Sequence, residues 1–158
     1  MTVTYLPYIN CSSGVQASAK NYVSSCFFGE YDPKNITVAA IQQKVVGILV
    51  YAEPTAYYKN IVGRPSVYLL HVKVDEEHRR KGIAASLINE TLGRLQNLAL
   101  FVEVVMPKEG TPDICHFIKR LDKVKELRSY SLEKVTYMRY IIENARDGIR
   151  GSGKAANP

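Results

Sequence analysis

The sequence predicts one domain of the α/β (α+β) class, in which helices flank a mixed β-sheet. Three observations support this class. In some segments apolar residues recur every three or four positions, as in amphipathic helices, and in others they gather in short β-branched runs. Two pairs of strand-like runs are separated by short turns, which predicts antiparallel hairpins. The predicted elements follow the order β-α-β-β-β-α-β-α-β-β.

The composition is typical of a globular protein from a reducing compartment. The 158 residues suffice for one compact domain, and 46% hydrophobic and 23% charged residues are usual values. Cys11, Cys26 and Cys115 are an odd number without C-x-x-C spacing, which argues against a disulfide framework or a zinc site. No apolar run approaches the ~18 residues of a membrane span, and the N-terminus lacks a signal-peptide pattern. We therefore expect a cytoplasmic protein with no metal and no membrane partner.

The net charge of +6, with a pI of about 9.2, suits an anionic ligand, an acidic protein surface or RNA, and does not choose among them. Apart from His78–Lys81 and the last residues, basic side chains are spread through the chain. Because no basic tract is interleaved with aromatic residues, nucleic acid is not an expected partner.

The N-terminal region predicts a strand followed by a helix. Thr2–Ile9 has strand character, and Pro7 indicates an edge position. Ser12 and Ser13 are candidate caps for a helix whose apolar spacing continues to Gly29.

Two strands, Ile36–Ile41 and Val45–Ala52, follow as a predicted antiparallel hairpin. The second is almost continuously apolar, which predicts a central strand. Gly47 within it indicates a close approach of another backbone or a bulge. The loop Glu53–Pro65 precedes the next strand.

The most informative stretch is a strand, Val67–Val74, followed by the polar loop Asp75–Lys81 and a long amphipathic helix that begins near Gly82. The apolar positions of this helix follow a period of about 3.6 residues. These positions are Ala84, Leu87, Ile88, Thr91, Leu92 and Leu95.

This strand–loop–helix unit predicts a cradle for an anion. The first N–H groups of a helix have no partner within the helix, and the helix dipole adds partial positive charge there. Gly82 permits positive φ and a close approach of a ligand to the backbone. Arg79, Arg80 and Lys81 add full charges. The predicted ligand is a phosphate or a pyrophosphate.

The C-terminal region predicts a strand, a helix and a closing hairpin. Ala99–Met106 is the strand, and Thr111–Asp113 is a helix start with a cap, a proline and an acid. Leu127–Tyr130 and Val135–Ile142 form the hairpin. We expect a single domain over residues 1–144 and, from its Gly-rich polar composition, a flexible tail over residues 145–158.

The pattern Arg79-x-x-Gly82-x-Ala84, after the strand Leu69–Val74, resembles the acyl-CoA pyrophosphate loop of the GNAT N-acetyltransferase superfamily. The resemblance implies a sheet whose fourth and fifth strands splay apart, with the pantetheine arm of CoA in the gap. The residues that would bind CoA through the fourth strand are Val72, Lys73 and Val74. Those that would bind its pyrophosphate are Arg79, Arg80, Lys81, Gly82, Ile83 and Ala84.

The resemblance also points to catalytic residues. Tyr68 aligns with a position where several family members keep a base. Glu103 is a carboxylate in an apolar strand, which is costly unless it is paired, exposed or functional. Tyr130 and Tyr137 are candidate acids. His71 is on the opposite face of its strand by parity, which predicts a core or second-layer histidine.

One segment departs from the family. His116–Leu121 is similar to the family's Phe-Tyr-Glu-Lys-Leu segment, whose tyrosine commonly protonates the leaving thiolate. Ile118 occupies that position and cannot donate a proton.

The leading hypothesis is therefore an acyl-CoA-dependent N-acyltransferase, with acetyl-CoA as co-substrate and no metal. An amine, on a small molecule, a peptide or a protein, would attack the thioester directly in a ternary complex. A homodimer is left open. Ile118 favours an alternative, a catalytically inactive CoA-binding or partner-binding member, and the net charge of +6 prompts a third, a transferase acting on aminoacyl-RNA.

Overall fold

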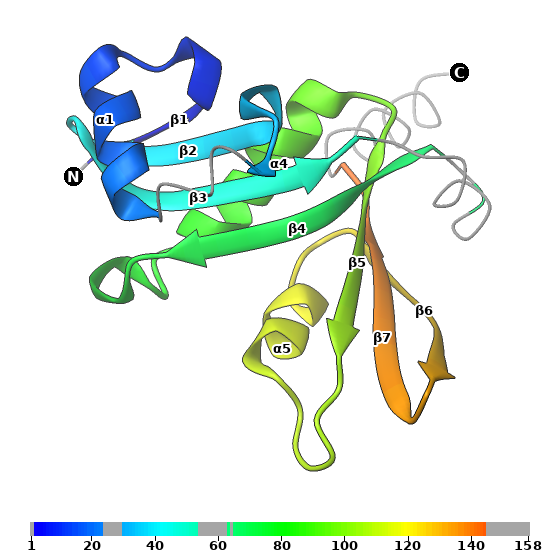
Figure 1. The fold of residues 1–158 in the computed structure, drawn as a ribbon. Helices are drawn as coiled ribbons and strands as arrows, with labels where there is room; N and C mark the ends of the chain where they lie inside the picture. Colours follow the sequence, from blue (N-terminus) through cyan, green and yellow to red (C-terminus); the bar gives the residue numbers. More distant parts are fainter. Residues whose placement is uncertain (1, 24–29, 54–62, 64, 145–158) are drawn as a thin grey trace. The chain divides into compact units, whose positions relative to one another are not determined.

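The computed structural model of the protein describes residues 2–23, 30–53, 63 and 65–144 (Figure 1). Its elements in chain order are β1 (Val3–Pro7), η1 (Tyr8–Asn10), α1 (Ser13–Tyr22), η2 (Pro33–Asn35), β2 (Ile36–Ile41), β3 (Lys44–Ala52), β4 (Ser66–Val74), η3 (Glu76–His78), α4 (Ile83–Leu95), β5 (Ala99–Val105), α5 (Asp113–Lys119), β6 (Val124–Leu132) and β7 (Val135–Ile142).

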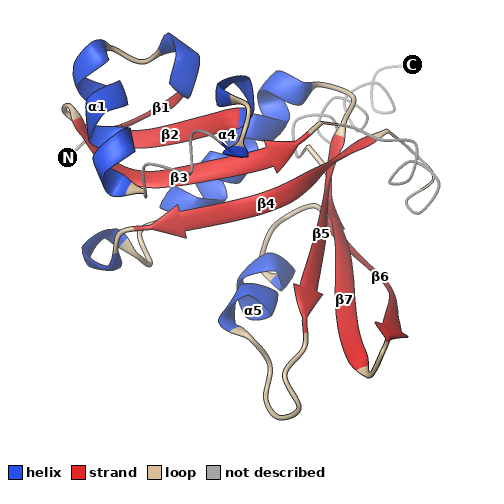
Figure 2. Cartoon of the chain, in the orientation of Figure 1, coloured by secondary structure: helices blue, strands red, loops and turns tan. Residues whose placement is uncertain are grey.

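The strands form a seven-stranded sheet in the order β1-β2-β3-β4-β5-β7-β6 (Figure 2). The pairs β1–β2, β2–β3, β5–β7 and β6–β7 are antiparallel, whereas β4 and β5 are parallel. The parallel ladder ends at Tyr68 and Phe101, although β4 continues to Val74 and β5 to Val105. The predicted fold class is confirmed: a mixed, mostly antiparallel sheet in which the fourth and fifth strands form a parallel pair, flanked by helices.

The chain forms two compact units, which are described separately below. The first contains the described parts of residues 1–53 and 69–94, and the second those of residues 54–68 and 95–158. β4 therefore contributes its first three residues to the second unit and the rest to the first. The predicted tail over residues 145–158 lies outside the described residues, and the single domain over residues 1–144 stays a prediction.

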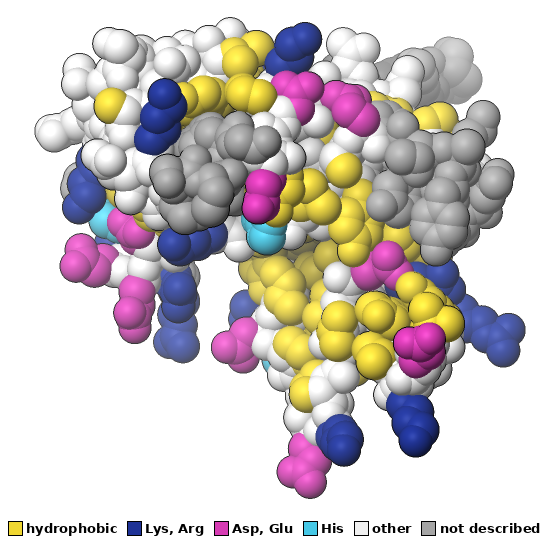
Figure 3. All heavy atoms as spheres, viewed as in Figure 1, with side chains coloured by type: hydrophobic (Ala, Val, Ile, Leu, Met, Phe, Trp, Pro, Cys, Tyr) yellow, Lys and Arg dark blue, Asp and Glu magenta, His cyan; other side chains and the backbone are white. Residues whose placement is uncertain are grey.

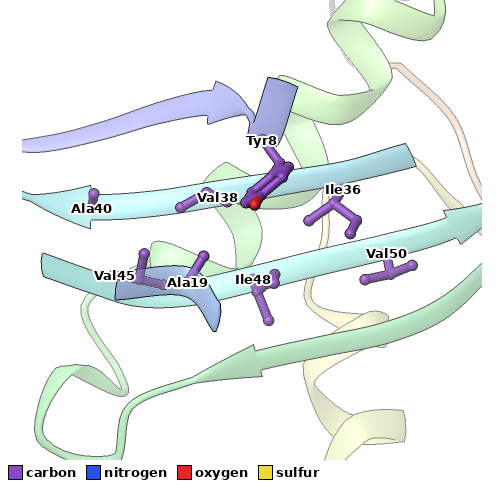
Figure 4. Close-up of a cluster of buried hydrophobic side chains, with 8 residues drawn as sticks. All are labelled: Tyr8, Ala19, Ile36, Val38, Ala40, Val45, Ile48 and Val50. Carbon is purple, nitrogen blue, oxygen red and sulfur yellow. The ribbon is translucent and has the colours of Figure 1, made fainter. Parts of the chain in front are cut away.

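The first unit has an apolar core between α1 and one face of β2 and β3. Ser12 caps α1, since its Oγ accepts a hydrogen bond from the Val15 N–H at 3.3 Å. Figure 4 shows how side chains from η1, α1, β2 and β3 meet in this core. The cluster consists of Tyr8, Ala19, Ile36, Val38, Ala40, Val45, Ile48 and Val50.

Helix α4 packs on the other face of these two strands. The hydroxyl groups of Thr37 and Thr91 are 2.8 Å apart, and the guanidinium of Arg94 also donates to the Thr37 hydroxyl. A Cβ atom at Gly47 would lie only 3.2 Å from Leu87 Cδ1 and 3.3 Å from the backbone oxygen of Lys73. The predicted close approach at Gly47 is therefore confirmed.

The predicted bulge lies directly beside Gly47. Ala39 pairs with Gly47 but Ala40 pairs with Val45, so Val46 is the extra residue of β3. The carbonyl of Val46 accepts a hydrogen bond from the Asp75 N–H at 2.9 Å. The bulge thus fixes the residue at which β4 ends and the following loop begins.

Replacing Gly47 with valine is expected to destabilise the protein by about 1–3 kcal/mol, because the new side chain overpacks the contact between β3 and α4. Thermal unfolding measures the loss. Gly14→Ala is the control: its added Cβ meets the flexible end of the Gln43 side chain, and alanine is favoured in a helix. A Gly47→Val protein as stable as wild type would contradict this packing.

The second unit combines the ladder of β5, β7 and β6 with α5. Cys115 and Ile118 of α5 and Tyr140 of β7 are fully buried. The predicted hairpin is confirmed, and its turn residues Glu133 and Lys134 have φ of 49° and 67°, as in a type I′ turn. The start of α5 lies one residue later than predicted.

Two expectations about this region need correction. Pro112 is the N-cap of α5, where Thr111 was predicted, and no side chain makes a capping hydrogen bond there. β6 is longer than predicted, spanning Val124–Leu132 with a register shift between Leu127 and Tyr130. The shift interrupts the alternation from which a strand is recognised in sequence.

Candidate functional site

The loop between β4 and α4 has an unusual backbone. It contains the 3₁₀ turn η3, then Arg79 in an extended conformation. Arg80 and Gly82 both have positive φ, 62° and 78°. A left-handed conformation costs roughly 1–2 kcal/mol for a residue with a Cβ, so Arg80 is strained. Turns of this kind direct successive N–H groups toward one side and form concave anion sites.

The N–H groups of this loop are available to a ligand. The first hydrogen bond of α4 runs from the Ser86 N–H to the Gly82 carbonyl at 3.0 Å. Within the described part of the chain, the N–H groups of residues 80–85 have no backbone acceptor. No atom of the described residues lies within 4 Å of the position of a Cβ at Gly82, so these residues leave the mouth of the helix open.

Three cationic residues directly precede Gly82 in this loop. Arg79, Arg80 and Lys81 are all exposed, whereas Glu76 and Glu77 supply nearby exposed acids. Arg79 has a second role, because its Nε donates to the carbonyl of Val74 at 3.1 Å and joins the loop to the end of β4. Binding of a phosphate or a pyrophosphate to this loop stays a prediction.

Tyr22 of α1 connects the loop to the core. Its hydroxyl donates to the Val46 carbonyl at 3.4 Å, the same carbonyl that holds Asp75. The Lys73 Nζ lies 4.8 Å from the centre of its ring. Burial, and next the nearby Asp75 carboxylate, raise the pKa of Tyr22. The loop is thus held by main-chain and aromatic contacts that leave its N–H groups free.

The residues predicted to bind the pantetheine arm lie in the same unit. Val72, Lys73 and Val74 form the end of β4, beyond the last residue that pairs with β5. Their use by a ligand stays a prediction.

The candidate base residues lie in the second unit, on one face of its sheet. Tyr68 pairs with Phe101, and their ring centres are 5.8 Å apart. Glu103 follows Phe101 by two residues and therefore shares its face. The Oε2 atom of Glu103 is buried and has no hydrogen-bond partner among the described residues. Tyr68 and Glu103 thus lie on one face of this sheet, and the role of either residue as a base stays a prediction.

The two candidate acids stack on each other in the same unit. The rings of Tyr130 and Tyr137 are 4.9 Å apart and nearly parallel, at 14°. Because Tyr137 pairs with Val105 across β5–β7, both tyrosines share the face of Glu103. Arg139 lies on this face as well, opposite Glu103. The sequence analysis missed Arg139, although its spacing of two from Tyr137 within one strand places both on one face.

Ile118 takes no part in this face. It is fully buried in α5, as is Cys115, which lies next to Tyr140. Burial, and then Cys115, raise the pKa of Tyr140, whose hydroxyl does not reach hydrogen-bonding geometry with the thiol. An isoleucine side chain has no proton to donate, so position 118 lacks a proton donor, as predicted.

The expectation for His71 was wrong. The residue is exposed, and its Nε2 forms a hydrogen bond of 2.8 Å with the Tyr31 hydroxyl. Parity predicts the face on which a side chain lies, but it does not predict whether another element covers that face.

Within the described residues, no three His, Cys, Asp or Glu side chains are grouped to hold a metal ion. Over the same residues, no helix has both the length and the apolar character needed to span a membrane.

The family model described as "Acetyltransferase (GNAT) family" matches residues 8–114. The chain therefore belongs to the GNAT acetyltransferase family. No curated protein shows significant sequence similarity to it.

Solved structures show the same fold at low sequence identity. A chain of the NatC complex bound to Gag peptide and CoA is 17% identical, with 90% of this chain and 99% of that chain covered and a TM-score of 0.58. NAA60 from Arabidopsis thaliana, in complex with a bisubstrate analogue, is 16% identical, with 89% and 97% covered and a TM-score of 0.59. The ribosomal-protein-S18-alanine N-acetyltransferase from Escherichia coli is 12% identical, with 89% and 93% covered and a TM-score of 0.56. At these identities the likeness concerns the fold.

Proposed function

We propose that the protein is an acyl-CoA-dependent N-acyltransferase that transfers the acetyl group of acetyl-CoA to an amine. One observation carries the proposal: the open mouth of α4 presents the free N–H groups of residues 80–85 in a loop with three exposed cations, in a chain that belongs to the GNAT family. A diphosphate is the ligand that such a mouth suits best.

In this proposal each predicted residue has a role. The N–H groups of the loop, including those of Gly82, Ile83 and Ala84, hold the diphosphate together with Arg79, Arg80 and Lys81. The main chain of Val72–Val74 binds the pantetheine arm, and an N–H group there stabilises the oxyanion that forms on the thioester carbonyl. The acceptor would be a small amine, a peptide or a protein; the Gag peptide bound to the NatC complex makes a peptide one candidate to test.

The chemical step needs a base. An amine with a pKa of ~10.4 is neutral in only about one molecule in a thousand near pH 7.4, which costs ~4 kcal/mol. Glu103, directly or through water, or Tyr68 takes the proton from the ammonium ion. The neutral nitrogen then forms the bond to the carbonyl carbon and gives up its second proton to water. The carbon–sulfur bond breaks, and the leaving thiolate takes a proton from Tyr130, Tyr137 or water. A positioned base contributes roughly 10²–10⁴-fold in rate.

The surroundings proposed for this reaction follow from the composition. The three cysteines without paired spacing favour a reducing compartment, the cytoplasm. We also propose a single acyl-CoA-binding domain over residues 1–144, a flexible tail over residues 145–158, and no metal in the reaction.

A second candidate function is supported by Ile118, which is fully buried where the family commonly has its proton donor. It is a catalytically inactive member that binds CoA or a protein partner. Incubation with acetyl-CoA and a broad panel of amines, followed by detection of free thiol, separates the two functions. Turnover with any amine removes the inactive alternative, and CoA binding without turnover on the whole panel removes the proposed activity.

A further inference from the structure

A charged pair on the second unit's sheet does not form an ion pair. Glu103 and Arg139 are direct partners across the antiparallel β5–β7 ladder, so their side chains share one face. Opposite charges in such positions usually bind each other. Among the described residues, however, neither side chain makes an ion pair.

Arg139 instead binds β6, the strand on the side of β7 away from β5. Its Nε and Nη2 donate to the carbonyl of Arg128 at 3.0 and 2.6 Å. Its Cζ lies 4.6 Å from the centre of the Tyr130 ring. The carbonyl of Arg128 lies within the register shift of β6, and such irregularities reorient backbone groups. A guanidinium has five N–H donors, so donors remain for an anionic group.

Glu103, in contrast, has a carboxylate oxygen that receives no hydrogen bond from the described residues. Its Oε2 is buried without a hydrogen-bond partner in the part of the chain that the structure describes. A buried acceptor without a partner is costly, and each such group in a native protein calls for an explanation. A hydrogen-bond donor from a ligand or a water molecule would satisfy this oxygen.

Apolar and aromatic rows lie on both sides of this charged pair. One row consists of Phe101 and Ile141, with Tyr68 beside Phe101. The other row consists of Val105, Tyr137 and Tyr130. In Figure 3 hydrophobic side chains gather over β5 and β7. Phe101 and Ile141 are buried, whereas the three tyrosines of these rows are partly exposed. A ligand lying across the charged pair would therefore contact Tyr68 on one side and Tyr137 and Tyr130 on the other.

We propose that Glu103 and Arg139 bind the two ends of a zwitterionic acceptor, with the ammonium group at Glu103 and a carboxylate at Arg139. A bridge between the two side chains consists of one hydrogen bond at each end of the amino acid and the distance between its ammonium and carboxylate groups. Together these make about three hydrogen-bond lengths, roughly 8 Å. Arg139 starts from β7, but its guanidinium is held at the Arg128 carbonyl of β6, and β6 lies two strand spacings, roughly 10 Å, from the β5 strand of Glu103. The inference rests on the proposed N-acyltransferase function and narrows its acceptor to free amino acids. Arg139 is then the residue that determines specificity.

Turnover of matched acceptors tests this inference. A panel of L-amino acids and the corresponding amino acid amides is offered with acetyl-CoA, and free thiol is followed. The amides have the less basic amine, so chemistry alone favours them. We expect wild type to prefer at least one free amino acid over its amide by 10-fold or more in kcat/KM. Arg139→Gln should raise the KM for that amino acid by about 10–100-fold and leave the value for its amide within about 2-fold.

Two further variants test whether the charge of the Arg139 side chain causes the preference for free amino acids. Arg128→Gln is the matched control, because Arg128 contributes only its backbone carbonyl to the contact and its side chain is exposed. It should keep the wild-type preference. Arg139→Lys retains the charge and should recover part of the preference that Arg139→Gln loses. Thermal unfolding of all three variants identifies any loss of fold.

The possible failures are distinguishable. Amides turned over as well as free amino acids by wild type, or an unchanged preference in Arg139→Gln, would overturn the zwitterion site and leave the N-acyltransferase function standing. Absence of thiol release with every amine would overturn the proposed function. In that case calorimetry with the same amino acids and amides, with and without CoA, tests the zwitterion site by binding alone. Tighter binding of free amino acids than of amides, lost in Arg139→Gln, supports the site. Equal binding of the two, or no binding, overturns it.

Discussion

Gly82→Glu is expected to weaken CoA binding by at least 100-fold while the protein stays folded. The substitution places a carboxylate at the open mouth of α4, where the diphosphate would lie. Two like charges 4 Å apart repel by about 4 kcal/mol at an effective dielectric constant of 20. Among the residues that the structure describes, no atom lies within 4 Å of a Cβ at this position, so the change introduces no steric clash with them. Isothermal titration calorimetry with CoA measures the effect.

Gly110→Glu is the matched control for this variant. Gly110 has a φ of 79°, close to the 78° of Gly82, and a Cβ there would also meet nothing within 4 Å. The two variants therefore share the change in charge and the cost of a left-handed glutamate, but Gly110 lies outside the loop. Gly110→Glu should bind CoA like wild type. Equal affinity of both variants and wild type would disprove the diphosphate site.

The loop and its flanking elements could be predicted because their signals are local. An apolar strand, a polar loop with Gly82 and a helix with a clear period follow one another within about thirty residues of chain. The structure adds what a linear pattern cannot contain. The Val46 carbonyl, on the bulge of a strand far earlier in the chain, holds Asp75 and thereby sets where the loop begins.

Residues brought together by strand register were less predictable. Glu103 was recognised as unusual, because a carboxylate in an apolar strand is costly. Its partner across the ladder, Arg139, is separated from it by the whole of α5 and β6, and nothing local indicates the register. The strand β6 was predicted too short for a related reason, since its register shift interrupts the pattern. His71 shows that parity alone does not determine burial.

Glu103→Gln is expected to lower kcat by about 10²–10⁴-fold, the usual contribution of a general base. The amide has nearly the same shape as the carboxylate but does not accept a proton from the ammonium ion. Tyr68→Phe tests the second candidate, and the variant with the larger loss identifies the base. The measurement is the steady-state rate of thiol release from acetyl-CoA at saturating amine, together with the thermal midpoint of each variant.

The stability of Glu103→Gln distinguishes a functional carboxylate from a structural one. The buried Oε2 of Glu103 has no partner among the described residues, so a neutral amide there should cost less to bury. We therefore expect the thermal midpoint to stay constant or to rise while activity falls, as found where a protein keeps an unfavourable group for its chemistry. Glu126→Gln is the control, because Glu126 pairs with Tyr140 and so lies on the opposite face of the same sheet. If Glu103→Gln unfolds at a lower temperature and keeps its kcat, Glu103 stabilises the fold and the base must be sought at Tyr68.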